Sequence, residues 1–580
     1  MKTFRTILPF MKKHKWHYIW GILALIVVDL ANLLLPQVIK RFANWAKDGT
    51  MDQDKVLWTA LAVIILGSLV GIGRFLWRTN IFGTARRLEH WLRAELFNKY
   101  LSLDDHFFTQ HRTGDLMAHA TNDILMVRNT LGGGIIMTVD ALFMSVFTIA
   151  LMIYTVGIKT ALVGLLALPF LSIMVAFVAK PLQNRSRAVQ DTFSDMTIEV
   201  QENLSGISSI KSFVIEENRS DSFSKVNKQY AKDNMALVRI AAIMEPMVSL
   251  ISGAAFIIFL FYSINQMVHG QLTLGDFLAV QTYIMMMIWP LIAIGMLVAS
   301  FQRGIAAMSR INEILNSKAK VKEPQIPMQA AEGETTIEFK DVWFRYADDL
   351  PWVLEGVSFK LEPHKSLAIL GRTGTGKTTI INLLLRRYDV TQGEILLNGV
   401  NIKDLCLEDL YSRMAYVEQE SFLFSRSIAG NIAFSSEESY DLDRVKSAAK
   451  FSQVHDDIEQ MPEGYTTWVG ERGVTLSGGQ KQRVSIARAY YAQAEILILD
   501  DSLSAVDTNT EKSILNHLKT FSHSLIMVSQ RVSTVKGADQ IMVIEDGKIS
   551  QRGNHQTLME DTEGFYHKLY QRQLLELELK

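Results

Sequence analysis

Six apolar stretches, each long enough to cross a bilayer, occupy most of the first 300 residues of this chain. A helix needs roughly 20 predominantly apolar residues to cross the hydrocarbon core, and backbone groups in lipid must be hydrogen-bonded within the segment. The sequence therefore predicts a helical membrane domain within residues 1–315, with a lipid bilayer around it. The predicted spans lie near residues 17–35, 57–77, 131–155, 160–179, 240–263 and 277–300.

The connections after the second and fourth predicted spans are long and rich in Lys and Arg, including Arg86, Arg87, Lys180 and Arg185. Because basic residues accumulate on the cytoplasmic side, these loops, the N-terminus and everything after residue 300 are expected in the cytoplasm. The apolar spacing inside the loops is helical. We therefore expect the spans to continue as helices well beyond the bilayer.

The pattern changes after residue 315. Residues 316–335 are polar, contain Pro324 and Pro327, and have no apolar period, which is typical of a linker. From 336 to 580, short β-branched runs such as 366–370 alternate with helical stretches, which indicates an α/β domain. A chain of 580 residues is also too long for a single core.

Charge is nearly balanced over the chain. There are 59 Lys and Arg against 60 Asp and Glu, so the composition does not mark the molecule as a nucleic-acid binder. A DNA-handling ATPase is further excluded by the six predicted spans. We expect no nucleic-acid partner.

The strongest local motif is the phosphate-binding loop, which follows the apolar run 366–370 and precedes a helical run. Glycines let backbone N–H groups approach the phosphates of ATP closely, next to a helix N-terminus. Lys377 adds a positive charge near the terminal phosphates, and the Thr378 hydroxyl can hold Mg²⁺. The predicted ATP contacts of this loop are Gly371, Arg372, Thr373, Gly374, Thr375, Gly376, Lys377, Thr378 and Thr379.

A second acidic motif follows the apolar run 496–499, which ends in Asp500. A carboxylate at this place fits the acidic residue that binds Mg²⁺ in P-loop folds that hydrolyse nucleotides. An isolated aspartate at a strand end would be unremarkable. The phosphate loop upstream favours the metal-binding interpretation.

Between these motifs stands Leu476-Ser477-Gly478-Gly479-Gln480. With the phosphate loop, Asp500 and six spans in this order, the whole chain resembles an ATP-binding cassette (ABC) exporter of the half-transporter type. The resemblance implies a type I exporter fold, a six-helix membrane domain followed by an α/β P-loop nucleotide-binding domain. It also implies that Tyr346 stacks on adenine, that Gln419 joins Thr378 and Asp500 at Mg²⁺, and that Asp507 and Glu471 lie at an interface.

In that family two nucleotide domains dimerise head to tail. The resemblance therefore implies that Ser477, Gly478, Gly479 and Gln480 contact ATP held by a partner chain. A serine hydroxyl, glycine N–H groups and a helix N-terminus suit an anion cradle. Two cytoplasmic segments, at 105–117 and 206–214, resemble the family's coupling helices, which press on clefts of the nucleotide domains.

Two positions depart from the family pattern. Asp501 stands where the family normally has a glutamate that polarises the attacking water, and it is shorter by one methylene, about 1.5 Å. Gln530 stands where the family has a histidine, and an amide cannot take up a proton as imidazole does. Losing both catalytic positions costs on the order of 10² to 10⁴ in rate. The alternative is that both are tolerated variants.

These departures, beside an intact signature, favour asymmetric pairing. The chain resembles the degenerate-site subunit of a heterodimeric bacterial multidrug exporter, whose partner half-transporter would supply a competent site. Asp29, Asp140 and Glu245 lie within or at the predicted spans. Because intramembrane charges are costly, at roughly 2.5 to 3.5 kcal/mol each, they are expected to face the bundle or its cavity. An acidic lining would suit amphipathic cations, although pairing with neighbouring helices is an equal alternative.

The sequence thus predicts ATP-driven export of small amphipathic or hydrophobic compounds across a bacterial plasma membrane, with ATP and Mg²⁺ as cofactors. The alternatives are a dedicated lipid or peptide exporter, and a sensor subunit that binds ATP without pumping. Cargo-stimulated hydrolysis accompanied by movement of the cargo separates a pump from a sensor.

Overall fold

A computed structural model describes residues 2–324, 326–331, 334–436, 439–470, 476–519 and 523–578. The chain divides into two compact units. The helical unit comprises Met1–Ser102 and His111–Ser317, and the cassette unit comprises Leu103–Gln110 and Lys318–Lys580. A short helix from the first long loop thus belongs to the cassette unit rather than to the helices that flank it in sequence.

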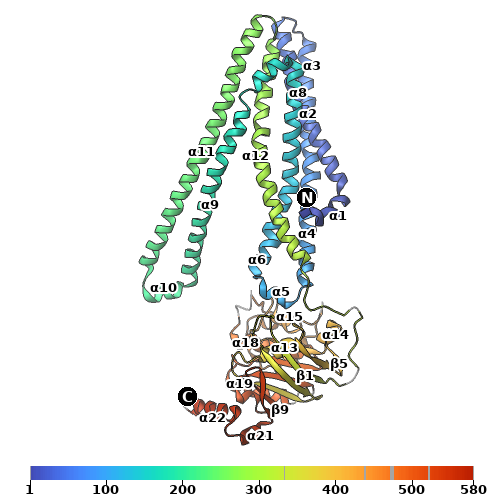
Figure 1. Ribbon diagram of the computed structural model, residues 1–580, viewed down its shortest axis with the longest axis vertical. Coiled ribbons are helices and arrows are strands. Elements are labelled where there is room, and N and C mark those ends of the chain that lie inside the picture. Colours follow the sequence, from blue (N-terminus) through green and yellow to red (C-terminus); the bar gives the residue numbers. More distant parts are fainter. Residues whose placement is uncertain are drawn as a thin grey trace. The chain divides into compact units, whose positions relative to one another are not determined.

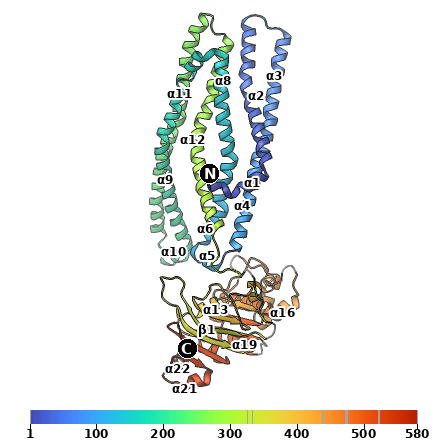
Figure 2. The ribbon, with the colours of Figure 1, turned by 45° about the vertical axis from the view of Figure 1, so that its right-hand side comes forward.

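The helical unit is built from long helices (Figures 1 and 2). Their bounds are α2 Lys15–Lys47, α3 Gln53–Trp77, α4 Gly83–Leu101, α8 Ile135–Leu165, α9 Pro169–Ser205, α11 Glu216–Val268 and α12 Leu274–Asn316. Shorter elements complete it: η1 Lys2–Ile7, α1 Leu8–Lys13, η2 Arg78–Phe82, α6 Thr113–Ala118, η3 His119–Asp123, α7 Ile124–Asn129, η4 Thr130–Gly134 and α10 Ile207–Phe213.

Five helical stretches in the described part of the chain are long and apolar enough to cross a membrane. They are Lys15–Lys47, Gln53–Leu101, Thr113–Leu171, Glu216–Val268 and Leu274–Asn316. Inside α8, Gly157 has φ 76° and ψ 163°, so the helix direction breaks there. This break lies between the predicted third and fourth spans, and the predicted fourth span crosses the junction of α8 and α9.

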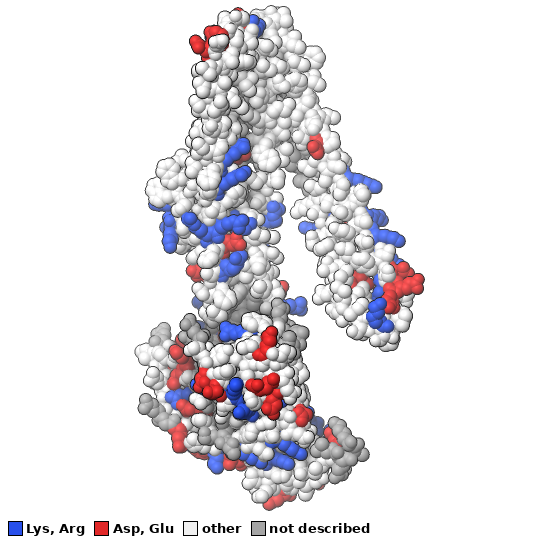
Figure 3. Space-filling view, turned by 180° about the vertical axis from the view of Figure 1, so that it is seen from behind, with Lys and Arg blue, Asp and Glu red and all other residues white. Residues whose placement is uncertain are grey.

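The helices extend well beyond a bilayer. At 1.5 Å per residue, the 53 residues of α11 measure about 80 Å, against about 30 Å for a hydrocarbon core. α9 and α11 run side by side along most of their length (Figure 2). On the face shown in Figure 3, the upper part of the helical unit is almost free of charged side chains, whereas Lys and Arg gather lower down. This distribution matches helices that leave the lipid on their basic side.

The described residues of the cassette unit form two sheets (Figure 1). One is antiparallel, in the order β2-β1-β4-β5, and the other has the order β10-β9-β3-β8-β7-β6 with parallel pairing from β9 to β6. The strands are β1 Ile337–Phe344, β2 Leu354–Leu361, β3 Ser366–Leu370, β4 Gln392–Leu397, β5 Val400–Asn401, β6 Met414–Val417, β7 Ile496–Asp500, β8 Ser524–Ser529, β9 Gln540–Glu545 and β10 Lys548–Gly553.

The central strands β3, β7 and β8 are almost fully buried, as expected for a parallel sheet covered on both faces. The helices around the two sheets are α5 Asp105–Gln110, α13 Lys377–Leu384, α14 Leu407–Ser412, α15 Ile428–Ile432, α16 Leu442–Phe451, α17 His455–Glu459, η5 Gly464–Thr466, α18 Gly478–Tyr491, α19 Thr508–Lys519, α20 Val532–Val535, α21 His555–Glu560 and α22 Phe565–Glu578. Because β3, β7 and β8 pair in parallel, the loops at their carboxyl ends converge at one edge of the sheet. Ligands bind at this edge in open α/β sheets.

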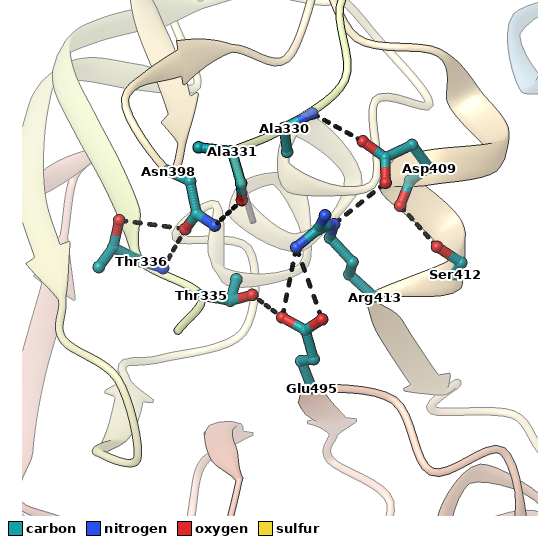
Figure 4. Close-up of polar contacts among 9 residues, drawn as sticks. All are labelled: Ala330, Ala331, Thr335, Thr336, Asn398, Asp409, Ser412, Arg413 and Glu495. Carbon is teal, nitrogen blue, oxygen red and sulfur yellow. Dashed lines mark hydrogen bonds and ion pairs between the residues drawn. The ribbon is translucent and has the colours of Figure 1, made fainter. Parts of the chain in front are cut away.

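The segment predicted as a linker is partly fastened to the cassette surface (Figure 4). The Ala330 N–H donates to Asp409 at 2.8 Å, and the Asn398 amide donates to the Ala331 carbonyl at 2.9 Å. Arg413 contacts Asp409 at 3.1 Å and Glu495 at 3.5 Å, so the cluster is shared between this segment and two parts of the cassette. The N–H of Ala330 and the carbonyl of Ala331 lie outside any helix or strand, and these side chains supply their hydrogen-bond partners.

Candidate nucleotide site and signature helix

The phosphate loop connects β3 to α13, as the sequence predicts. Gly374 and Gly376 adopt φ values of +85° and +97°, a region that side chains with a Cβ rarely occupy. At Gly376 a Cβ would lie 2.8 Å from Leu354 Cδ2 and 3.0 Å from the Val353 carbonyl oxygen. Only glycine lets the loop pass this close to the start of β2. The loop geometry therefore depends on the glycines that the motif places there.

Lys377 is almost completely buried at the start of α13. Its ammonium donates to the carbonyl of Gly371 at 2.9 Å and to that of Arg372 at 2.6 Å. Burial lowers the pKa of Lys377, while the nearby charges of Asp501 and Asp500 raise it. The side chain thus carries a positive charge in a water-poor place, where it interacts strongly with phosphate.

A cavity of about 360 Å³ adjoins the phosphate loop. It brings together the predicted residues Tyr346, Gln419, Asp500, Asp501 and Gln530 from four separate segments. The remaining lining is Val353, Thr373, Gly374, Gly376, Lys377, Thr378, Thr379 and Val528.

Three predicted loop residues, Gly371, Arg372 and Thr375, are not part of this lining. The guanidinium of Arg372 lies over the Phe565 ring, 5.5 Å from its centroid. The hydroxyl of Thr375 donates to the Arg372 carbonyl at 3.0 Å. Both side chains are thus occupied within the protein in this structure.

Asp500 ends β7 and is 1% exposed. Burial raises the pKa of Asp500, whereas hydrogen bonds from Thr378 and Tyr416 and the charges of Lys377 and Arg387 lower it. The Tyr416 hydroxyl donates to its Oδ2 at 3.3 Å. The Asp500 carboxylate, the Thr378 hydroxyl and the Gln419 amide line one cavity, and they are the oxygen donors that Mg²⁺ prefers.

Asp501 adopts φ +46° on the turn after β7, a conformation that aspartate tolerates better than most residues. Its N–H donates to the Val528 carbonyl at 2.9 Å, which fixes the turn against β8. Burial raises the pKa of Asp501, as does the charge of Asp500, while Arg531 and Lys377 lower it. The backbone of this turn therefore fixes the position from which the short Asp501 side chain extends.

Gln530 lies across the cavity on the loop after β8. Its Oε1 accepts from the Thr373 hydroxyl at 3.3 Å, so the amide contacts the phosphate loop itself. Its backbone carbonyl accepts from the Gln573 amide at 2.9 Å. The residue that replaces the family's histidine thus lies in the site, with a donor–acceptor group that does not titrate.

Arg531 is a site residue that the sequence reasoning missed. Its guanidinium donates to Glu511 at 3.4 Å and to the Ser504 carbonyl at 3.0 Å. It therefore joins the loop after β8 to the loop after Asp500. Its position next to Gln530 was the only sequence signal that could have indicated this role.

On the opposite side of the cavity, the Tyr346 hydroxyl lies 3.1 Å from the hydroxyl of Thr379. The Tyr388 ring stands edge-on to Tyr346, with centroids 5.2 Å apart, and Phe344 is 4.9 Å away. Such edge-to-face packing fixes the orientation of an aromatic ring. The face of Tyr346 thereby becomes a fixed platform for a flat base, and Tyr388 is a second residue that sequence reasoning missed.

The signature residues form the exposed N-terminus of α18. Ser477 is its N-cap: its hydroxyl accepts from Gln480 N–H at 3.3 Å, and Gln480 Oε1 accepts from Ser477 N–H at 3.0 Å, a capping box. At Gly479 a Cβ would lie 3.0 Å from the Ala505 carbonyl oxygen. Further along α18, the buried Gln482 accepts from Ala505 N–H at 3.1 Å. The signature is therefore packed against the 504–507 loop.

Of the two predicted interface residues, Asp507 is exposed and accepts from the N–H groups of Asn509 and Thr510 at 3.2 and 3.1 Å. It thus caps α19 at the end of the same loop. Glu471 lies outside the described residues.

Within the helical unit, Asp29 on α2 and Asp140 on α8 interact through their carboxyl groups, and Trp289 on α12 interacts with Asp140. Asp29 is 4% exposed, and its Oδ2 has no hydrogen-bond donor among the described residues. Glu245 is exposed on α11. The structure thus brings two of the three predicted intramembrane acids together inside the bundle.

The cassette has a phosphate loop whose glycines adopt positive φ, a buried aspartate at a strand end and an exposed glycine helix capped by serine. Together with membrane-length helices in the same chain, these features define a nucleotide-driven membrane transporter. Family models agree: the ABC transporter transmembrane region matches residues 18–291, and the ABC transporter model matches residues 354–504. The chain belongs to the ABC transporter family, and it is an ATP-hydrolysing exporter of the multi-pass membrane type with a cytoplasmic ATP-binding domain.

Among its relatives, the multidrug resistance-like ATP-binding protein MdlA of Escherichia coli is 34% identical, over 100% of this chain and 98% of that protein. The probable multidrug resistance ABC transporter ATP-binding/permease protein YheI of Bacillus subtilis is also 34% identical, over 98% of this chain and 97% of its own length. The ATP-dependent lipid A-core flippase of Haemophilus influenzae is 32% identical, over 99% and 97%.

A solved structure of a bacterial Atm1-family ABC exporter with ATP bound matches with a TM-score of 0.79, at 24% identity over 96% of this chain and 99% of that one. It supports the fold alone. The type I exporter fold expected from the sequence is confirmed.

Proposed function

We propose that this chain is one half of a heterodimeric exporter of amphipathic or hydrophobic compounds, with a degenerate ATP site of its own. One observation carries the proposal: Asp501 and Gln530 line the same cavity as an intact phosphate loop. A site with complete phosphate contacts and altered water-positioning groups would bind ATP firmly and hydrolyse it slowly.

The signature helix supports the second half of this proposal. Ser477, Gly479 and Gln480 have their helix-capping geometry complete and exposed. In a head-to-tail pair, this surface would close on ATP held by the partner, whose own catalytic glutamate and histidine would then carry hydrolysis. A homodimer of this chain would contain two slow sites.

Mg²⁺ is proposed as the metal that accompanies ATP. Thr378, Gln419 and Asp500 would hold it by their oxygen atoms, and the metal would neutralise phosphate charge as it does in other P-loop hydrolases. The buried and hydrogen-bonded state of Asp500 keeps that carboxylate in a fixed place facing the cavity.

The proposed cargo is a small amphipathic molecule carrying a positive charge, and the proposed location is a bacterial plasma membrane. The Asp29–Asp140 pair provides a buried acidic group, and the indole N–H of Trp289 donates to Asp140. An organic cation gains from both a carboxylate and an indole ring. Two relatives named for multidrug resistance support this class of cargo.

Lipid export is the second candidate function, because a relative over nearly the full length is named a lipid A-core flippase. The two candidates separate in vesicles that contain the exporter. ATP-driven uptake of a fluorescent organic cation that is lost in Asp29→Asn supports the first, and ATP-driven movement of a labelled lipid without cation uptake supports the second.

The test of the heterodimer is the ATPase activity of the purified chain, alone and after co-expression with a second half-transporter encoded beside it. We expect low activity alone and high, cargo-stimulated activity in the pair. Brisk hydrolysis by the chain alone would show that Asp501 and Gln530 are competent, and the proposal of a degenerate site would fail.

A further inference from the structure

The short helix α5 is bonded to two consecutive residues that follow the phosphate-loop helix α13. Arg387 Nε contacts Asp105 Oδ2 at 3.0 Å. The Tyr388 hydroxyl interacts with Thr109, and its ring stands edge-on to His106 with centroids 6.3 Å apart. All of these residues belong to the cassette unit. Two neighbouring side chains, Arg387 and Tyr388, thus join helix α5 to two different sides of the nucleotide site.

Arg387 leads toward the metal side of the site. Its guanidinium lies over the Tyr416 ring, 5.1 Å from the centroid, and it also contacts Glu418 at 3.1 Å. The Tyr416 hydroxyl in turn donates to Asp500 at 3.3 Å. A cation stacked on tyrosine fixes the position of the ring, and the ring fixes the direction of its hydroxyl. The path from Asp105 to Asp500 therefore has three contacts.

Tyr388 leads toward the base side. It packs edge-on against Tyr346, the platform for adenine, at 5.2 Å. The turn that carries both residues is itself fixed, because the preceding Arg386 is 3% exposed, adopts φ +50°, and donates to the carbonyls of Leu405 and Lys322. Movement of α5 would therefore displace contacts at both the base side and the metal side of the nucleotide site.

We propose that Arg387 is a positioning residue that holds Asp500 through Tyr416 and ties its orientation to the placement of helix α5 through Asp105. Arg387 touches neither ATP nor Mg²⁺ in this role. The inference is independent of whether the exporter is a heterodimer, because it concerns how this chain's own site is assembled.

The measurement is equilibrium binding of a fluorescent ATP analogue to the full-length exporter, with Mg²⁺ titrated at fixed nucleotide. Tyr416→Phe keeps the ring under Arg387 and removes the hydroxyl, and we expect it to raise the half-saturating Mg²⁺ concentration about threefold to tenfold. Arg387→Ala is expected to act in the same direction. Asp105→Asn breaks a partly exposed ion pair and is expected to raise the concentration about twofold to fourfold.

Three comparisons separate positioning from simple docking of α5. Asp105→Glu keeps the charge and is expected to restore the wild-type Mg²⁺ requirement. Asp105→Asn in a Tyr416→Phe background is expected to add nothing, because the path is already broken. Asp104→Asn is the matched control: Asp104 is adjacent, but it accepts from the N–H groups of Phe107 at 3.2 Å and Val321 at 3.0 Å rather than from Arg387. Asparagine removes the charge and keeps an oxygen acceptor for these N–H groups, so it should leave the requirement unchanged.

Equal shifts in Asp104→Asn and Asp105→Asn would overturn the proposal in favour of general docking, as would additive effects in the double variant. Hydrogen exchange of α5 provides a second readout that does not depend on the binding titration. Mg²⁺ added to ATP should protect residues 103–110 in the wild type and in Asp105→Glu but not in Asp105→Asn. Unchanged protection in Asp105→Asn would also count against the relay.

Discussion

The ATP cavity and the signature surface of the cassette differ in how closely they follow the exporter pattern. The signature surface keeps every element: a serine N-cap, two glycines and a glutamine that completes the capping box. The cavity keeps the phosphate loop and Asp500 but has Asp501 and Gln530 in place of the usual glutamate and histidine. The contrast indicates that the groups predicted to bind phosphate and the groups predicted to activate water can differ separately, because Asp501 and Gln530 stand on the turns after β7 and β8, apart from the loop after β3.

The largest effect is expected from giving the cavity the glutamate and histidine that the family usually has, which removes the difference between the two regions. Asp501→Glu combined with Gln530→His adds a longer carboxylate and a titratable ring to the cavity, and we expect hydrolysis at this chain's site to rise by about 10² to 10⁴. Single-turnover hydrolysis, with the partner's site inactivated, measures it. A rise below threefold would show that the slow step depends on other residues.

The second-largest effect is expected from a change that weakens ATP binding in the cavity and leaves the signature residues unchanged. Lys377→Ala deletes a buried positive charge beside the phosphates, and ATP affinity at this site should fall about 10-fold to 100-fold. Equilibrium nucleotide binding measures it. Thr375→Ala is the control in the same loop, because its hydroxyl donates to the Arg372 carbonyl and Thr375 is not part of the cavity lining. This variant should bind ATP nearly as tightly as wild type.

A smaller effect is expected from the signature surface. Ser477→Ala removes the N-cap of α18 at a cost of about 0.5 to 2 kcal/mol in helix stability. It should slow hydrolysis of ATP held by the partner while leaving affinity in this chain's own cavity unchanged. Site-specific photolabelling by an ATP analogue separates the two sites. Equal losses at both would contradict the assignment of this surface to the partner's nucleotide.

The smallest effect lies outside both regions, in the cluster of Figure 4. The backbone N–H of Ala330 and the charge of Arg413 lower the pKa of Asp409. A carboxylate whose pKa is lowered in the folded state stabilises the fold at pH values above 3.8, the ordinary pKa of aspartate. This stabilisation is lost as the pH falls through the lowered pKa.

Asp409→Asn should therefore loosen residues 328–331 at neutral pH by about 1 kcal/mol or less. Amide exchange in this segment measures the change. ATP affinity should stay within twofold of wild type, and a larger shift would show that the segment is coupled to the cavity.

Contiguous features were readily predicted. Strand β3 has the bounds of the apolar run 366–370, and β7 extends the run 496–499 by one residue, to Asp500. Strand β10 was missed because its alternating, half-exposed residues Lys548–Gly553 form no apolar run, and β4 begins with polar, exposed residues. Their pairing with neighbouring strands, rather than their composition, makes them strands.

The sequence by itself determined the family, the phosphate loop and the two departures at Asp501 and Gln530, because each depends on residue types at fixed spacing along a short segment. Only the tertiary structure decided which distant residues serve that loop. Arg531 reaches Ser504 and Glu511, and Arg387 joins Asp105 to Tyr416, because chain folding brings these segments within a few ångströms. Such contacts have no sequence period, since they depend on side-chain directions set by packing from separate elements.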